Sequence, residues 1–243
     1  MVHFYDIHTH RLLPPVENCR QIVNRIVGID KVFPEEEKLS CGIHPWHIQD
    51  ANAQLEELKS RLDTFNNIVA IGEAGLDKLH SPVSLLQQQE IFHQQALLAE
   101  EYGKPLIIHC VKAWEEIIRE KKSLRPSVPW IIHGFRGKGE LARQLLREGF
   151  RLSFGLHSQP SALREAWPDA LLLETDEAEV GIEVIYRKTS AALGVPLDEL
   201  ARKVEENVSL CLLSRPEMQS YAGIKAQLAK KSYLCPTKFI YNE

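Results

Sequence analysis

The feature that most constrains the fold is a repeated alternation of short apolar runs with longer amphipathic segments. Runs such as 68–72 and 105–109 are almost continuously apolar, which is typical of strands in a parallel sheet covered on both faces. Eight runs are predicted as strands, at 2–8, 22–28, 39–43, 68–72, 105–109, 129–133, 150–154 and 170–175. Helical periodicity predicts helices at 52–65, 83–103, 113–122, 138–148, 180–193 and 197–213. This order predicts an α/β fold, a TIM-type (β/α)₈ barrel.

The first two connections between strands depart from this regular pattern. Pro14 and Pro15 interrupt segment 11–21, and Pro34 interrupts segment 29–38. Because an interior proline removes a helical hydrogen bond and clashes with the preceding turn, neither segment is expected to hold a full crossover helix. We therefore expect a barrel whose first two crossover helices are reduced.

The chain has 243 residues, 44% of them hydrophobic, which is enough for the core of one barrel domain. We expect that domain to span 1–213. A C-terminal extension follows at 214–243, where the sequence predicts a helix at 217–231 but indicates no role.

Charge and cysteine content restrict the class of protein. The net charge is −4 and the pI is about 6.2, so no global basic field attracts nucleic acid. The five cysteines are odd in number and form no CxxC pair, which argues against a disulfide framework and a structural zinc module. No signal-peptide pattern or run of 18 apolar residues is visible. We expect a cytoplasmic protein with no membrane partner.

His8 and His10 lie at the end of the first predicted strand, separated by one residue. Alternate residues of a strand point to the same side, so the two imidazoles can converge on one ion. An isolated His-x-His pattern also occurs at polar strand ends that bind nothing. Its meaning therefore depends on what the other strands carry.

Four other predicted strands also lead into residue types that bind metals. Glu73, His109, His133 and Asp176 each follow an apolar run. The carboxyl ends of barrel strands form one face, and active sites are built there. The pattern predicts one or two divalent ions held by His8, His10, Glu73, His109, His133 and Asp176. This mixed donor set suits zinc, manganese and related ions such as magnesium, so the identity of the metal stays open.

These residues lie in stretches that resemble the TatD-type metal-dependent hydrolases (the TatD-like DNase family) of the amidohydrolase superfamily. The resemblance covers about residues 1–210 in the family's order. The matching stretches are Asp6-Ile7-His8-Thr9-His10, Gly42-Ile43-His44-Pro45, Ile71-Gly72-Glu73-Ala74-Gly75-Leu76-Asp77, Ile107-Ile108-His109-Cys110, Ile132-His133-Gly134-Phe135 and Glu174-Thr175-Asp176. A weaker match lies at 88–95.

The resemblance implies a two-metal hydrolase of phosphodiester bonds, a deoxyribonuclease. It implies one ion held by His8, His10 and Asp176, a second held by His109 and His133, and Glu73 as a bridge between them. Two such ions polarise a phosphoryl oxygen and acidify a bound water. We expect Asp176 to accept or relay that water's proton, with Glu73 as the second catalytic carboxylate.

Three further residues are candidates for contacts with the substrate: His44, Lys112 and Arg136. His44 precedes a proline turn, so it can contact a scissile phosphate or simply belong to the loop. Lys112 can act as a phosphate clamp or as a solvated lysine at a helix start. Arg136 lies in a loop that can form an anion nest or an ordinary turn between strand and helix.

Two departures from the family pattern bear on the substrate. Val111 and Lys112 stand where the family usually has an arginine, and Glu177-Ala178-Glu179 stand where it usually has Ser-Pro-Tyr. Extra carboxylates repel a polyanion, so long duplex DNA is expected to bind weakly. Oligonucleotide ends or small phosphoesters then become the expected substrates. A lactonase or amidohydrolase using the same site, and a metal-binding protein without turnover, remain as alternatives.

Overall fold

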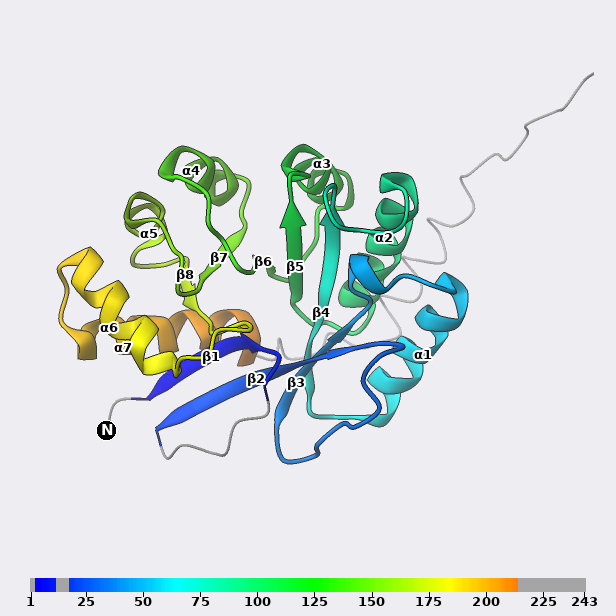
Figure 1. Ribbon diagram of the computed structural model, residues 1–243, viewed down its shortest axis with the longest axis horizontal. Helices are drawn as coiled ribbons and strands as arrows, with labels where there is room; N and C mark the ends of the chain where they lie inside the picture. The colour runs from blue at the N-terminus through cyan, green and yellow to red at the C-terminus, as the bar shows by residue number, and fades with distance from the viewer. Residues whose placement is uncertain (1–2, 12–17, 214–243) are drawn as a thin grey trace, which may run out of the picture. The chain divides into compact units, whose positions relative to one another are not determined.

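The computed structural model describes residues 3–11 and 18–213. Eight parallel strands form one sheet in sequence order from β1 to β8 (Figure 1). The strands are β1 (Phe4–Thr9), β2 (Cys19–Ile26), β3 (Lys38–Gly42), β4 (Ile68–Asp77), β5 (Leu106–Val111), β6 (Trp130–Ile132), β7 (Arg151–Phe154) and β8 (Leu171–Leu173). All eight predicted strands are therefore present.

Backbone hydrogen bonds between β1 and the segment after β8 nearly close the sheet into a barrel. Thr9 forms a parallel bridge with Asp176. The amide of Asp176 donates to the carbonyl of His8 at 2.9 Å, and the amide of His10 donates to the carbonyl of Asp176 at 3.2 Å. The predicted TIM-type fold is confirmed, and the two ends of the sheet meet at predicted metal ligands.

Helices connect most of the strands and cover the outside of the sheet. They are η1 (Pro45–His47, 3-10), α1 (Ala51–Thr64), α2 (Leu85–Glu101), α3 (Trp114–Leu124), α4 (Gly139–Arg147), α5 (Pro160–Ala166), α6 (Ile182–Leu193), α7 (Leu197–Val208) and the π-helical turn η2 (Ser209–Leu213). Five of the six predicted helices match to within two residues at each end; α7 ends at Val208, and the predicted remainder is η2. The sequence did not predict α5, because seven residues are too few to show a helical period.

The early crossovers are short. Residues 27–37, all of which are described, form turns and extended chain without a helix between β2 and β3 (Figure 1). Residues 10–18 separate β1 from β2, fewer than the dozen or so that a crossover usually needs. Segment 12–17 and the predicted extension at 214–243, with its helix at 217–231, lie outside the described residues.

Two strands continue past their predicted ends, which corrects the position of Glu73. β4 reaches Asp77, so Glu73 lies inside the strand and not just after it; β5 reaches Val111, two residues beyond His109, the last residue of the predicted strand. Glycines interrupt the apolar run of β4, but its backbone still pairs with β5, with Gly75 opposite His109. A Cβ at Gly75 would lie 1.9 Å from the carbonyl oxygen of His109. Glycine therefore allows the close approach that places Glu73 beside this histidine.

The core lies inside the barrel and between the strands and the helices. Ile7, Leu39 and Ile71 are fully buried on their strands, and Phe92 packs edge-on against Trp130 with ring centroids 5.5 Å apart. Burial of each such side chain contributes about 1.5–3 kcal/mol. This packing fixes the strand ends that carry the polar residues.

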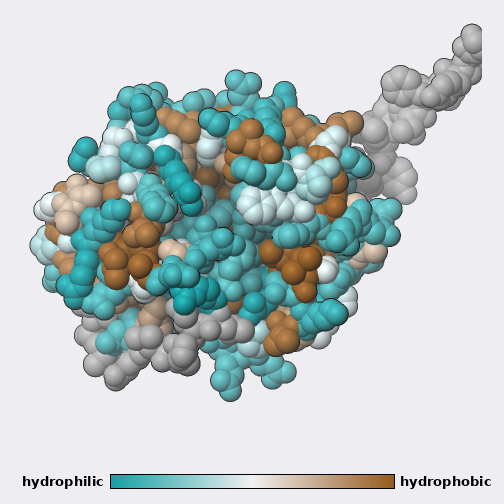
Figure 2. Space-filling model, in the orientation of Figure 1, coloured by the Kyte–Doolittle hydropathy of each residue, from teal (hydrophilic) through white to brown (hydrophobic). Residues whose placement is uncertain are grey.

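The surface of the described residues carries both hydrophobic and hydrophilic side chains. On the face drawn in Figure 2, hydrophobic patches are scattered among hydrophilic side chains. Within the described ranges, no helix is both long and apolar enough to cross a membrane. Cys19, Cys41, Cys110 and Cys211 are free thiols.

Candidate metal centre

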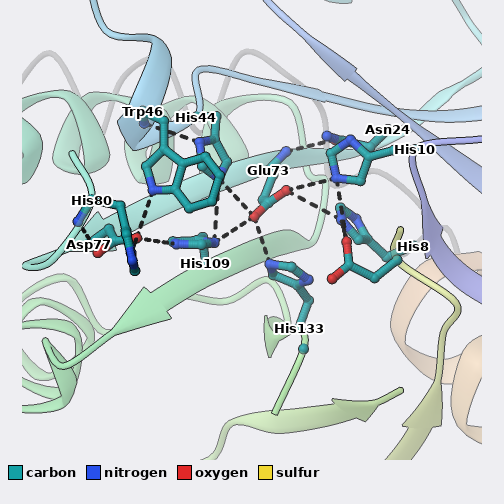
Figure 3. Close-up of polar contacts among 12 residues, drawn as sticks. His8, His10, Asn24, His44, Trp46, Glu73, Asp77, His80, His109 and His133 are labelled. Carbon is teal, nitrogen blue, oxygen red and sulfur yellow. Dashed lines mark hydrogen bonds and ion pairs between the residues drawn. The ribbon is translucent and has the colours of Figure 1, made fainter. Parts of the chain in front are cut away.

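The six predicted ligands converge at the carboxyl ends of five strands. The cluster is centred on the buried carboxylate of Glu73. Figure 3 shows five histidines that point toward it: His8, His10, His44, His109 and His133. The contributing residues are His8 and His10 from β1 and its end, Glu73 from β4, His109 from β5, His133 after β6 and Asp176 after β8.

The two oxygens of Glu73 face separate sets of imidazoles. Oε2 lies 3.3 Å from Nε2 of both His8 and His10. Oε1 lies 2.7 Å from Nδ1 of His109 and 2.7 Å from Nε2 of His133. One carboxylate thus stands between two groups of nitrogen donors, as a carboxylate bridging two cations would.

Asp176 belongs to the group around Oε2. Its Oδ1 lies 3.6 Å from Nε2 of His10 and 3.9 Å from Nε2 of His8. Its backbone has φ 56°, in the left-handed region that aspartate adopts more readily than most residues. The side chain is 27% exposed, so water can reach it.

The tautomer of His109 is set by Asp77. Nε2 of His109 lies 3.1 Å from Oδ2 of Asp77. Burial opposes ionisation of Asp77, but hydrogen bonds from Trp46, His109 and two backbone amides outweigh it and hold the pKa of that carboxyl well below its usual range. His109 therefore donates from Nε2, and the lone pair of Nδ1 points at Glu73. Two acceptors 2.7 Å apart repel each other unless a cation or a proton lies between them.

Burial and charge around His133 and His8 also favour a cation. Burial opposes a charged imidazolium at His133, but Glu73 and Glu174 outweigh it and raise its pKa well above the usual range. His8 is fully buried, and neither ring nitrogen has a hydrogen-bond partner among the described residues. Buried polar atoms without partners are rare in folded proteins. The donor set fits divalent metal ions, which would satisfy these nitrogens.

His44 lies beside this cluster as a neutral imidazole. The amide of Trp46 donates to Nδ1 of His44 at 3.1 Å, so the proton of the neutral ring sits on Nε2. That nitrogen is 3.1 Å from Oε1 of Glu73. Burial lowers the pKa of His44 and keeps the ring neutral. Geometry alone groups His44 with Glu73 and His109 as a ligand trio, but this tautomer favours a hydrogen-bond donor.

Several supporting contacts were not predicted from the sequence. Oδ1 of Asn24, on β2, accepts hydrogen bonds from the amide of Glu73 at 2.9 Å and from Oγ of Ser40 at 3.0 Å. Oε1 of Gln88 accepts from the amide of Asp77 at 2.7 Å, which ties α2 to the end of β4. Asn24 was detectable as one of two polar residues, with Arg25, within the otherwise apolar run 22–27.

Two carboxylates hold the segment that carries Asp176. Asp6 accepts hydrogen bonds from the amide and the hydroxyl of Thr175, and burial raises the pKa of Asp6 to about 7. Oε1 of Glu174 accepts from the amide of Gly134 at 2.6 Å and lies 3.4 Å from Nδ1 of His133. The Glu-Thr-Asp stretch is thereby fastened to both β1 and β6.

The three candidate substrate residues have different positions. His44 lies within the cluster, as described above. Arg136 is exposed and lines a cavity of about 220 Å³ together with His157, Asp176 and Glu177. Lys112 is exposed at the end of β5, and among the described residues it makes no contact with the cluster. The role of each in binding substrate stays a prediction.

The bond between Asp77 and His109 leads to a prediction about metal affinity. In Asp77→Asn, the amide nitrogen would face the donors on Trp46 and His109, so the ring of His109 would lose its fixed tautomer. We expect metal affinity to fall by about 10–100-fold, the usual effect of losing such a partner. Titration with manganese or zinc measures it. Trp46→Phe is the control, because it removes a hydrogen bond to Asp77 but leaves the bond to His109; an equal loss in both variants would contradict this role.

The fold and the site define a barrel protein with the donor set of a metal-dependent hydrolase. The family described as TatD related DNase matches residues 15–212. The match covers well over half of the chain, so the chain belongs to this family. The family resemblance predicted from the sequence is confirmed.

Comparisons with individual proteins agree with this assignment. The uncharacterized metal-dependent hydrolase YabD of Bacillus subtilis is 34% identical over 54% of this chain and 56% of its own length. The 3'-5' ssDNA/RNA exonuclease TatD of Pantoea ananatis is 34% identical over 56% of each chain. The chain thus spans only a little over half the length of these two relatives. The crystal structure of YJJV, a TatD homolog from Escherichia coli, has a TM-score of 0.73 at 20% identity over 87% of this chain and 98% of that one, which supports the fold.

Proposed function

We propose that this chain is a divalent-metal-dependent phosphodiesterase that acts on the ends of short single-stranded oligonucleotides or on small phosphoesters. The observation that carries the proposal is the carboxylate of Glu73, whose two oxygens face separate groups of imidazoles. Two adjacent divalent ions suit displacement at phosphorus. The TatD protein of Pantoea ananatis, a 3'-5' ssDNA/RNA exonuclease, supports the substrate class.

His8, His10 and Asp176 would hold one ion, His109 and His133 the other, and Glu73 would contribute to both. When bound, such ions polarise a phosphoryl oxygen and lower the pKa of a water molecule.

The chain's own residues supply the remaining chemistry. The carboxylate of Asp176 accepts the proton of the attacking water, and its partial exposure gives that water access. The Nε2–H of His44, which lies 3.1 Å from Oε1 of Glu73 in the free protein, would donate to an oxygen of the phosphoryl group when substrate is bound. Arg136 contributes positive charge at the cavity beside Asp176.

The charge around the cavity restricts the substrate. Arg136 is the only arginine or lysine among the described residues that line it, whereas Glu174, Asp176 and Glu177 are carboxylates. Binding of long duplex DNA depends on many contacts between basic side chains and phosphates. A short substrate binds through only the one or two phosphates that reach the metal centre, so it does not depend on many basic side chains.

The test compares a long duplex with a short single strand at matched metal and salt concentrations. We expect a higher kcat/KM for the short single strand with manganese, zinc or magnesium. The control is Arg136→Ala, which should raise KM for the short strand and leave the order of preference unchanged. A clear preference for the long duplex would contradict the electrostatic argument.

A second candidate function uses the same centre on an uncharged substrate such as a lactone or an amide. The three carboxylates that line the cavity favour this alternative, because a neutral substrate avoids their repulsion. A panel of phosphodiesters, phosphomonoesters and lactones separates the two functions. Metal binding without turnover of any of them would point to a non-catalytic protein.

A further inference from the structure

A partly exposed tryptophan lies next to the candidate metal centre. Trp46 is 42% exposed, and it stands in η1 directly after His44. Its ring centroid is 4.9 Å from that of His44 and 5.7 Å from that of His109. An indole left partly in water beside a polar site offers apolar area to a ligand.

The indole is held in a fixed orientation. Its Nε1 donates to Oδ2 of Asp77 at 2.7 Å, and the amide of Trp46 is bonded to Nδ1 of His44. A side chain that is already ordered loses little conformational entropy when a ligand packs on it. The ring is therefore prepared for binding in the free protein.

Asp77 also orders the loop that lies beside the indole. Its Oδ1 accepts from the amides of Leu79 and His80 at 2.8 and 2.9 Å. The ring of His80 lies 5.7 Å from that of Trp46 and is 60% exposed, and Leu79 is 62% exposed. We call Trp46, Leu79 and His80 the aromatic rim.

The aromatic rim and the cavity lined by Arg136 and Asp176 lie next to different parts of the candidate metal centre. From the rim, Asp77 connects through His109 to Oε1 of Glu73, and Figure 3 shows this row of side chains. The cavity is lined by Asp176, whose neighbours are the histidines next to Oε2. No Trp, Tyr or Phe is among the described residues that line that cavity.

We propose that the aromatic rim is a subsite that stacks a planar ring, the base of the nucleotide whose phosphate occupies the centre. This inference rests on the proposed function, since it places the phosphate at Glu73. Stacking on an indole is tolerant of sequence, because every base has a π-face. The rim would thus select nucleotides over phosphoesters without a ring, while the cavity beside Asp176 would take a polar group.

The experiment measures binding of two small ligands by calorimetry in manganese-supplemented buffer. The ligands are 2′-deoxyadenosine 5′-monophosphate and 2-deoxyribose 5-phosphate, which share the sugar and the phosphate; the second has a hydroxyl group in place of the base. The wild-type protein is expected to prefer the nucleotide. Trp46→Leu should weaken nucleotide binding by roughly 5- to 150-fold, the usual range for loss of a stacking ring, with little change for the sugar phosphate.

Two further variants separate stacking from other effects. Trp46→Phe keeps a ring but lacks the donor to Asp77, so it should retain most of the preference for the nucleotide. Leu210→Ala removes another exposed apolar side chain, on η2, and should leave both affinities unchanged. Loss of affinity for both ligands alike in Trp46→Leu, or no preference in the wild type, would overturn the subsite.

A parallel assay of oligonucleotide hydrolysis distinguishes this inference from the proposed function. If the wild type hydrolyses oligonucleotides but shows no base preference that depends on Trp46, the subsite is contradicted and the proposed phosphodiesterase activity stands. If binding depends on the base and on Trp46 but the protein hydrolyses no phosphodiester, the proposed phosphodiesterase activity is contradicted and the subsite stands.

Discussion

Replacement of Glu73 by glutamine is expected to abolish simultaneous binding of two metal ions and to remove most hydrolytic activity. Each carboxylate oxygen of Glu73 faces its own pair of predicted ligand histidines at 2.7–3.3 Å. Glutamine has nearly the same shape, but its amide nitrogen is a donor and cannot bind a cation. The variant therefore keeps one oxygen for one group of histidines and presents N–H groups to the other.

The expected loss in metal affinity exceeds about 100-fold, because removing a hydrogen-bond partner of a ligand already costs about 10–100-fold. Elemental analysis after dialysis, together with metal titration, measures the stoichiometry directly. The matched control is Glu174→Gln. Glu174 is also fully buried beside His133, but it is not among the six predicted ligands. We therefore expect Glu174→Gln to lower metal affinity by no more than about 10–100-fold. Two full equivalents of metal bound to Glu73→Gln would contradict a bridging role.

The barrel could be predicted from the sequence because its two signals are local. Apolar runs such as 105–109 mark the strands, and parallel strands place their carboxyl ends on one face, whatever the details of the loops. That geometry is sufficient to bring His8 and His133 together, although 124 residues lie between them (133 − 8 − 1). The exact strand ends were harder to predict, since glycines at 72 and 75 hide the continuation of β4.

The supporting contacts depend on side-chain orientation, which the sequence does not specify. The sequence does not show, for example, that Nε1 of Trp46 is bonded to Asp77 while part of its ring remains exposed. His44 and Arg136 each had two interpretations from the sequence, and the structure separates their positions: the His44 ring is buried against Glu73, and the Arg136 guanidinium is exposed at a cavity. Such differences arise from contacts between elements far apart in the chain, after the strands have set their positions.

Asp176→Asn is expected to lower kcat by about 10²–10⁴-fold, the usual contribution of a positioned general base. The fold should survive the change, because the contacts that fix residue 176 are backbone hydrogen bonds to His8 and His10. Asparagine also tolerates the left-handed conformation found there. What is lost is the negative oxygen, 3.6 Å from Nε2 of His10, that can accept a proton from water.

The matched control for Asp176→Asn is Glu177→Gln, which removes the same charge from the same cavity. Because no hydrogen bond or ion pair joins the Glu177 side chain to the six ligands among the described residues, its replacement is expected to change KM for a charged substrate and not to lower kcat. The assay must use saturating metal, and bound metal must be counted in both variants, so that loss of a ligand is separated from loss of a base. If metal-replete Asp176→Asn turned over at nearly the wild-type rate, proton transfer would have to be assigned elsewhere. Glu73, which lies 2.7–3.3 Å from four of the predicted ligand histidines, would then be the next carboxylate to test as the base.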